Sequence, residues 1–131
     1  MDLESKNDQE DNDLWGEDAM KDKPIYVAFA SKKLESNFEK LQTGKFEDKQ
    51  LYNYMERAIN DLKKNPISGI KIPKKLWPRY YSKEYQITNL WKYDLPNAWR
   101  LIYTIVEDQV MIVNVLLDWF SHKDYEKRFG Y

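Results

Sequence analysis

Residues 89–131 read NLWKYDLPNAWRLIYTIVEDQVMIVNVLLDWFSHKDYEKRFGY, and this stretch decides the fold. Two short polar turns, at 96–97 and 107–109, separate segments that are rich in apolar and aromatic residues. Such short turns join strands that run antiparallel to each other. The pattern therefore predicts a three-stranded antiparallel meander, with strands over residues 86–95, 99–106 and 110–117.

The first of these strands has two chemically different faces. Because side chains alternate along a strand, Trp91 and Tyr93 share one face with Leu95, while Lys92 and Asp94 share the other. This alternation predicts that the aromatic side chains pack into the core. The basic and acidic side chains are then left on the opposite face of the sheet.

The third strand and the segment after it are also well defined. Residues 110–117 are almost wholly apolar, which is typical of a strand buried on both faces. Ser121, followed by Asp124 three residues later, resembles a capping box and predicts a short C-terminal helix that ends at Gly130.

The segment before the meander predicts a strand and two helices. Residues 24–30, PIYVAFA, predict a strand, and a helix capped by Ser31 follows. Apolar residues at helical spacing predict a second helix over 48–64, so the two helices form a hairpin. Prolines and lysines mixed with aromatics predict mostly loop over 67–85. The predicted fold is α+β, in the order β-α-α-β-β-β-α: a helical hairpin on a small, mainly antiparallel sheet, with a short C-terminal helix.

Length and composition narrow the class of protein. The chain has 131 residues, of which 42% are hydrophobic, which suits one domain. No apolar stretch approaches the roughly 20 residues of a membrane-spanning helix, so we expect no membrane association. The chain has no cysteine and one histidine, so we expect no disulfide, no zinc site and no cofactor, and we expect a cytoplasmic location.

Charge is distributed unevenly along the chain. Residues 1–23 carry nine acids and three lysines, and they predict a disordered acidic tail before a domain over 24–131. The tail either only solubilises the chain, or folds back onto the basic face of the domain, or docks a partner through Trp15. Residues 63–103 hold nine bases and two acids, a net charge of +7 that attracts polyanions.

The carboxyl-terminal stretch resembles the RelE/ParE superfamily of type II toxin–antitoxin toxins. LWKY at 90–93 matches the aromatic–basic strand of that family, and WRLIY at 99–103 matches the strand after its turn. HKDY at 122–125 is similar to the family's terminal segment, and KKNPISGIKI at 63–72 looks like its link into the sheet. The order of predicted elements over 24–131 is also that of the family.

The resemblance implies a compact toxin that a small cognate antitoxin protein neutralises. RelE-like members cleave mRNA, mostly on the ribosome, without a metal ion. ParE-like members poison DNA gyrase, and many chromosomal relatives do neither. The resemblance therefore implies a metal-independent endoribonuclease with mRNA and the ribosome as partners. The alternative is a non-catalytic interaction protein on the same fold, either a gyrase inhibitor or a degenerate relative.

Four residues would carry the nuclease chemistry. Cleavage by a 2′-hydroxyl needs a base, an acid and a cation that stabilises the pentacoordinate phosphorane. Arg100 matches the family's arginine and suits a phosphate clamp, while Lys92 matches its basic strand position. His122 is the natural acid or base, and Tyr125 lies on the same helical face one turn later. Each residue also has an ordinary structural interpretation, and Asp94 departs from the second lysine that RelE-like nucleases often carry.

A second group of residues predicts contacts to single-stranded RNA. Bases that bind phosphates beside rings that stack on nucleobases are typical of such surfaces. The alternative is a solvated lysine face over core aromatics. The predicted RNA-binding residues are Lys71, Lys74, Lys75, Trp77 and Arg79.

Overall fold

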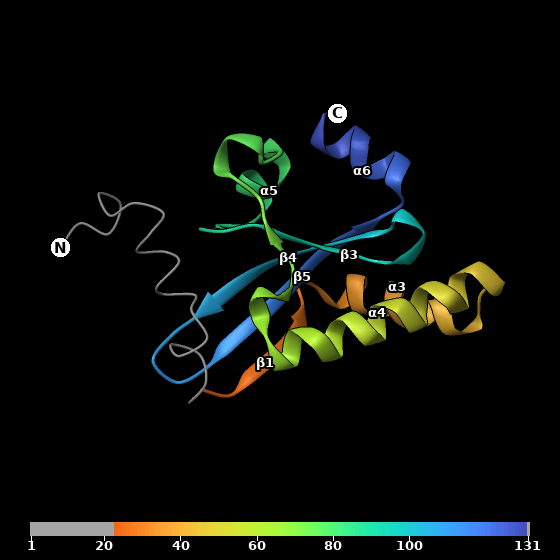
Figure 1. The fold of residues 1–131 in the computed structure, drawn as a ribbon, viewed down its shortest axis with the longest axis horizontal. Coiled ribbons are helices and arrows are strands. Elements are labelled where there is room, and N and C mark those ends of the chain that lie inside the picture. Colours follow the sequence, from red (N-terminus) through yellow and green to blue (C-terminus); the bar gives the residue numbers. More distant parts are fainter. Residues whose placement is uncertain (1–22, 131) are drawn as a thin grey trace.

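The computed structural model describes residues 23–130 and has an α+β fold around one five-stranded mixed sheet (Figure 1). The predicted acidic tail, apart from Lys23, lies outside the described residues. No helix within residues 23–130 is long and apolar enough to cross a membrane. The strands are β1 (Ile25–Phe29), β2 (Ile70–Lys71), β3 (Trp91–Asp94), β4 (Arg100–Glu107) and β5 (Ile112–Phe120), and the helices are α3 (Lys32–Lys40), α4 (Phe46–Lys64), α5 (Arg79–Glu84) and α6 (His122–Phe129).

The sheet has the strand order β1-β5-β4-β3-β2, and it confirms the predicted meander. β3, β4 and β5 pair antiparallel, while β1 pairs parallel with β5, with Ile25 opposite Ile112. β4 is the middle strand, and its residues 101–105 are all buried. The strand buried on both faces is therefore β4, whereas β5 keeps half-buried residues such as Val113 and Val115.

The helical hairpin of α3 and α4 covers one face of the sheet (Figure 1). The Ser31 hydroxyl accepts a hydrogen bond from the backbone N–H of Leu34 (3.1 Å), so it caps α3 as predicted. Met55 and Leu62 of α4 are fully buried, and they share a core cluster with Tyr103 of β4. The apolar spacing of α4 therefore decides which face of this helix meets the sheet.

Of the elements within residues 23–130, α5 and α6 cover one end of the opposite face (Figure 1). Tyr81 of α5 and Tyr125 of α6 are buried in a second core cluster with Ile102 of β4 and Leu117 of β5. The sheet therefore lies between the hairpin and a smaller layer that holds the predicted site residues.

The structure differs from the prediction in the segment that precedes β3. Residues 67–85 hold β2, the 3₁₀ turn η3 (Lys74–Leu76) and α5 instead of mostly loop. These elements are too short, and too interrupted by proline, to give a periodic pattern. The strand predicted over 86–95 also begins only at Trp91. At Asn89 the side chain, and not the backbone, makes the hydrogen bonds to the backbone of β4. Its amide bonds both the N–H and the C=O of Ile105 (2.8 Å each).

Candidate active site

The candidate site lies where the start of β4 meets the ends of β3 and β5. Arg100 pairs in register with Asp94 of β3 and with Phe120 of β5. The chain then turns at Ser121, whose hydroxyl accepts the N–H of Asp124 (3.3 Å) and caps α6 as predicted. The short connection places the first turn of α6 beside Arg100.

Three of the four predicted catalytic residues come together around one aromatic ring. The Arg100 guanidinium carbon lies 5.5 Å from the centre of the Tyr125 ring, and the Lys92 ammonium lies 5.7 Å from it. Both distances are within the range of a cation–π interaction. Tyr125 itself is only 4% exposed, so its ring is a fixed platform under the two cations.

Asp94 lies between the two cations. Its Oδ1 is 3.0 Å from Arg100 Nε and 3.4 Å from Lys92 Nζ. The carboxylate is 46% exposed, whereas the Arg100 side chain is 17% exposed. Arg100 also donates a hydrogen bond from Nη1 to the carbonyl of Trp99 (3.2 Å). The guanidinium is therefore held rigidly, and a substrate phosphate would have to share it with Asp94.

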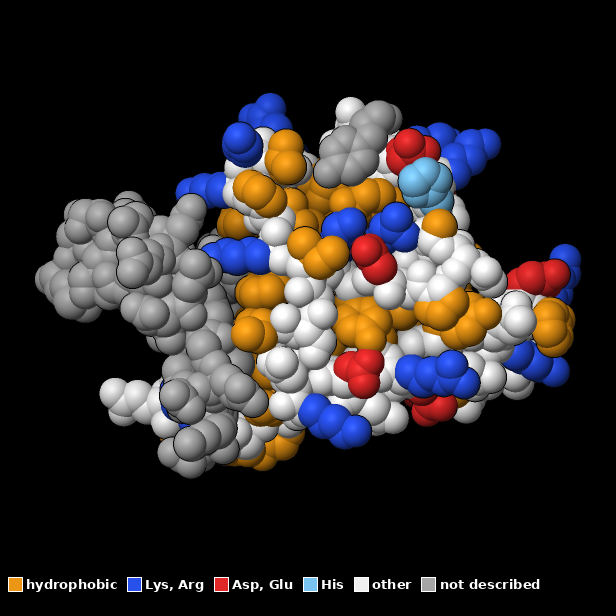
Figure 2. Space-filling view, viewed as in Figure 1, with side chains coloured by type: hydrophobic (Ala, Val, Ile, Leu, Met, Phe, Trp, Pro, Cys, Tyr) orange, Lys and Arg blue, Asp and Glu red, His pale blue; other side chains and the backbone are white. Residues whose placement is uncertain are grey.

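His122 lies at the outer rim of this cluster. It is the first residue of α6, its side chain is 56% exposed, and its Nε2 lies 3.4 Å from Glu126 Oε1. Among the described residues, no hydrogen bond or ion pair joins the imidazole to Lys92 or Arg100. In Figure 2 basic side chains, an acidic side chain and the chain's only histidine lie close together on the face toward the viewer. The imidazole can therefore reach a bound substrate from the solvent side.

The predicted RNA-binding residues are distributed over two faces. Ile70 of β2 is the register partner of Lys92, so Lys71 shares the face of its own partner, Trp91, which packs against the hairpin. Lys71 therefore lies on the side of the sheet opposite to Lys92. Lys74, Lys75 and Arg79 are exposed in η3 and at the start of α5.

Trp77 has a packing role in this structure. Its indole N–H donates to the carbonyl of Ile72 (2.8 Å), and its half-buried ring packs against the core cluster under α5 and α6. Tyr80, at 40% exposure, is more open to solvent than Trp77, although the Arg128 guanidinium lies over its ring.

Sequence reasoning missed a cluster that fixes α6 to the sheet. Arg128 lies 4.1 Å from the centre of the Tyr80 ring and 3.6 Å from the carboxylate of Asp118. The Tyr81 hydroxyl donates to the same carboxylate (3.0 Å), and burial raises the pKa of both Tyr81 and Asp118. The only sequence signal was the acidic residue in an otherwise apolar strand. This cluster holds the helix that carries Tyr125 and His122.

Comparison with known proteins identifies no relative. No family model, no curated protein and no solved structure matches the chain. Within residues 23–130, no three acidic or histidine side chains gather to hold a metal ion. The functional argument therefore rests on the residues themselves.

Proposed function

We propose that this protein is a metal-independent endoribonuclease of the RelE kind, which cleaves mRNA on the ribosome in the cytoplasm and is neutralised by a cognate antitoxin. The main support is that Lys92 and Arg100, from neighbouring strands, converge on the ring of Tyr125. Two cations held a fixed distance apart on a rigid base suit the nonbridging oxygens of a phosphate.

The proposed reaction uses only the chain's own side chains. The 2′-hydroxyl attacks the adjacent phosphorus, and the bond to the 5′-oxygen breaks, leaving a 2′,3′-cyclic phosphate and a 5′-hydroxyl. Lys92 and Arg100 stabilise the negative phosphorane. Asp94, beside both cations, accepts the hydroxyl proton, and His122 at the rim donates a proton to the leaving oxygen.

The test is cleavage of ribosome-bound mRNA with EDTA present. We expect wild-type protein to cut, and Arg100→Gln to lose about 10²–10³-fold in rate because one phosphorane donor is gone. His122→Ala should lose about 10²–10⁴-fold. The matched control is Arg57→Gln, an exposed arginine of α4 on the hairpin side of the sheet, which should cut like wild type.

Three further results decide the proposal. A substrate with a 2′-deoxynucleotide at the scissile position should resist cleavage, because the nucleophile is absent. Cleavage of that substrate would overturn the proposed reaction. So would loss of cleavage in EDTA, or equal rates for all three variants.

A second candidate function is a non-catalytic interaction protein on the same fold, such as a gyrase inhibitor. It is favoured by one observation: Arg100 is already engaged by Asp94 and by the Trp99 carbonyl. This candidate predicts that expression arrests growth, or that a partner is bound, equally well with His122→Ala. The nuclease predicts that His122→Ala relieves the arrest.

A further inference from the structure

The end of the sheet that no described helix covers carries a groove that the proposed nuclease does not use. Its volume is about 660 Å³. It lies between residues 104–107 of β4, Val115 and Leu117 of β5, and residues 85–88. This volume is within the range of about 300–1,000 Å³ that ligand sites occupy. Its apolar wall is made by Ile87, Val106, Val115 and Leu117.

A largely buried ion pair between Glu107 and Lys23 lies at one end of the groove. Glu107 lines the groove, and its side chain is only 10% exposed. One carboxylate oxygen, Oε2, pairs with Lys23 Nζ at 2.5 Å. The other, Oε1, is buried and has no hydrogen-bond partner among the residues described. Because Oε1 is closed to solvent, a molecule in the groove does not reach it, and Glu107 serves here as the anchor of Lys23.

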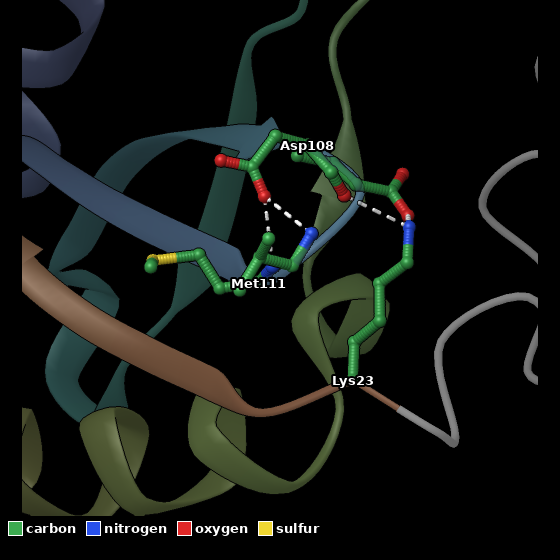
Figure 3. A network of polar contacts seen from close by, with 5 residues as sticks. Lys23, Asp108 and Met111 are labelled. Carbon is green, nitrogen blue, oxygen red and sulfur yellow. Dashed lines mark hydrogen bonds and ion pairs between the residues drawn. The ribbon is translucent and has the colours of Figure 1, made fainter.

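Lys23 is held at one end of the groove by two contacts. Its ammonium binds Glu107 and the carbonyl of Asp108 (3.0 Å), and the residue lines the groove (Figure 3). The Asp108 carboxylate in turn accepts the N–H groups of Val110 and Met111 (2.7 and 2.8 Å), which fixes the turn. Lys23, the first described residue, therefore lies at the rim of the groove.

We propose that Leu14-Trp15 of the same chain docks into this groove. Residue 15 is eight positions before Lys23, and an extended chain covers about 3.3 Å per residue, so the pair can reach the whole groove. Trp15 is the only aromatic residue among residues 1–22, and it combines a large apolar body with one N–H donor. The apolar body of Trp15 suits the apolar wall of the groove.

Charge also suits this occupant. Residues 1–22 carry nine acids and two lysines. The wall formed by residues 85–88 follows directly after the basic segment 71–83, whose Lys83 is exposed on α5. A docked tail therefore brings acidic residues next to exposed bases.

The test uses ¹⁹F NMR of the full chain labelled with 5-fluorotryptophan. Trp15→Phe assigns the Trp15 signal, and the other four tryptophan signals report on the fold. The measured quantity is the change in the ¹⁹F chemical shift of Trp15 when H₂O is replaced by D₂O. We expect this change to be only a small fraction, in the native protein, of its value in the urea-unfolded protein. A full solvent shift in the native protein would overturn the proposal.

Two matched variants locate the docking site. Val106→Lys places a charge in the groove at a side chain that is already 54% exposed, and it should restore the solvent shift of Trp15. Val110→Lys adds the same charge at the neighbouring turn, outside the groove, and should leave Trp15 shielded. An unchanged Trp15 signal in Val106→Lys overturns the proposal. Shielding that is lost on dilution also overturns it, because Trp15 would then occupy a second copy.

Discussion

The two faces of the sheet are built for different tasks. The hairpin face is covered by α3 and α4, and its buried Asn114 amide donates to the carbonyls of Tyr26 and Leu62 (3.1 and 3.2 Å). On the other face, the described helices α5 and α6 cover the end where Lys92 and Arg100 meet Tyr125. The comparison teaches that the larger core and the proposed site lie on opposite sides of one layer of strands, so the larger core can be altered with little direct effect on the site residues.

The largest expected effect is on the hairpin face. Met55→Ala removes a fully buried side chain of α4, and we expect the free energy of unfolding to fall by about 2–5 kcal/mol. Urea denaturation measures this change. The matched control is Met111→Ala, at a half-buried position in the β4–β5 turn, which should cost clearly less. Equal losses would mean that the hairpin face is not the main source of stability.

A smaller effect is expected at the helix that carries the site. Arg128→Ala removes the cation stacked on Tyr80 and paired with Asp118, and we expect a loss of about 1–2 kcal/mol. Hydrogen exchange should accelerate in α6 more than in α4. Lys127→Ala, at the exposed neighbouring position, is the control and should change neither quantity. Uniform acceleration across both helices would contradict a separate role for this cluster.

The smallest effect is a difference between two carboxyl groups of the β4–β5 hairpin. Burial raises the pKa of Asp118, while two backbone N–H groups lower the pKa of Asp108 below 3.8. The Asp118 contribution to stability therefore falls as pH rises from about 3.8 through its raised pKa. The Asp108 contribution is present above pH 3.8 and is lost as pH falls through its lowered pKa. Carboxyl ¹³C NMR titration should find Asp118 above Asp108, and the reverse order would contradict this assignment.

Local patterns predicted the elements that have a clear period or cap. The spacing of Met55 and Leu62 predicted the buried face of α4, and the alternation of Trp91 with Lys92 predicted the two faces of β3. Ser121 predicted the start of α6. These features depend on neighbours in the sequence, so the sequence alone defines them.

Features that depend on distant partners could not be predicted. The Asn89 side chain hydrogen-bonds to the backbone of Ile105, sixteen residues away, in place of strand pairing. The observed strand β3 is therefore shorter than the predicted one. Lys71 lies on the hairpin side only because of its pairing with Trp91 across β2 and β3. The salt bridge of Asp94 with Arg100 likewise depends on strand register, which the turn alone did not specify.

The most direct test of the proposed RNA site on one face of the sheet is the salt dependence of RNA binding. A 2′-O-methyl RNA cannot be cleaved, so its affinity is measured without turnover, and the salt dependence of that affinity reports the phosphate contacts. For Lys92→Gln and for Arg100→Gln we predict weaker binding and a slope of log affinity against log salt that is shallower by about 0.7 each. Arg57→Gln on the hairpin face should change neither. Equal effects of all three substitutions, or no effect of the first two, would contradict the account.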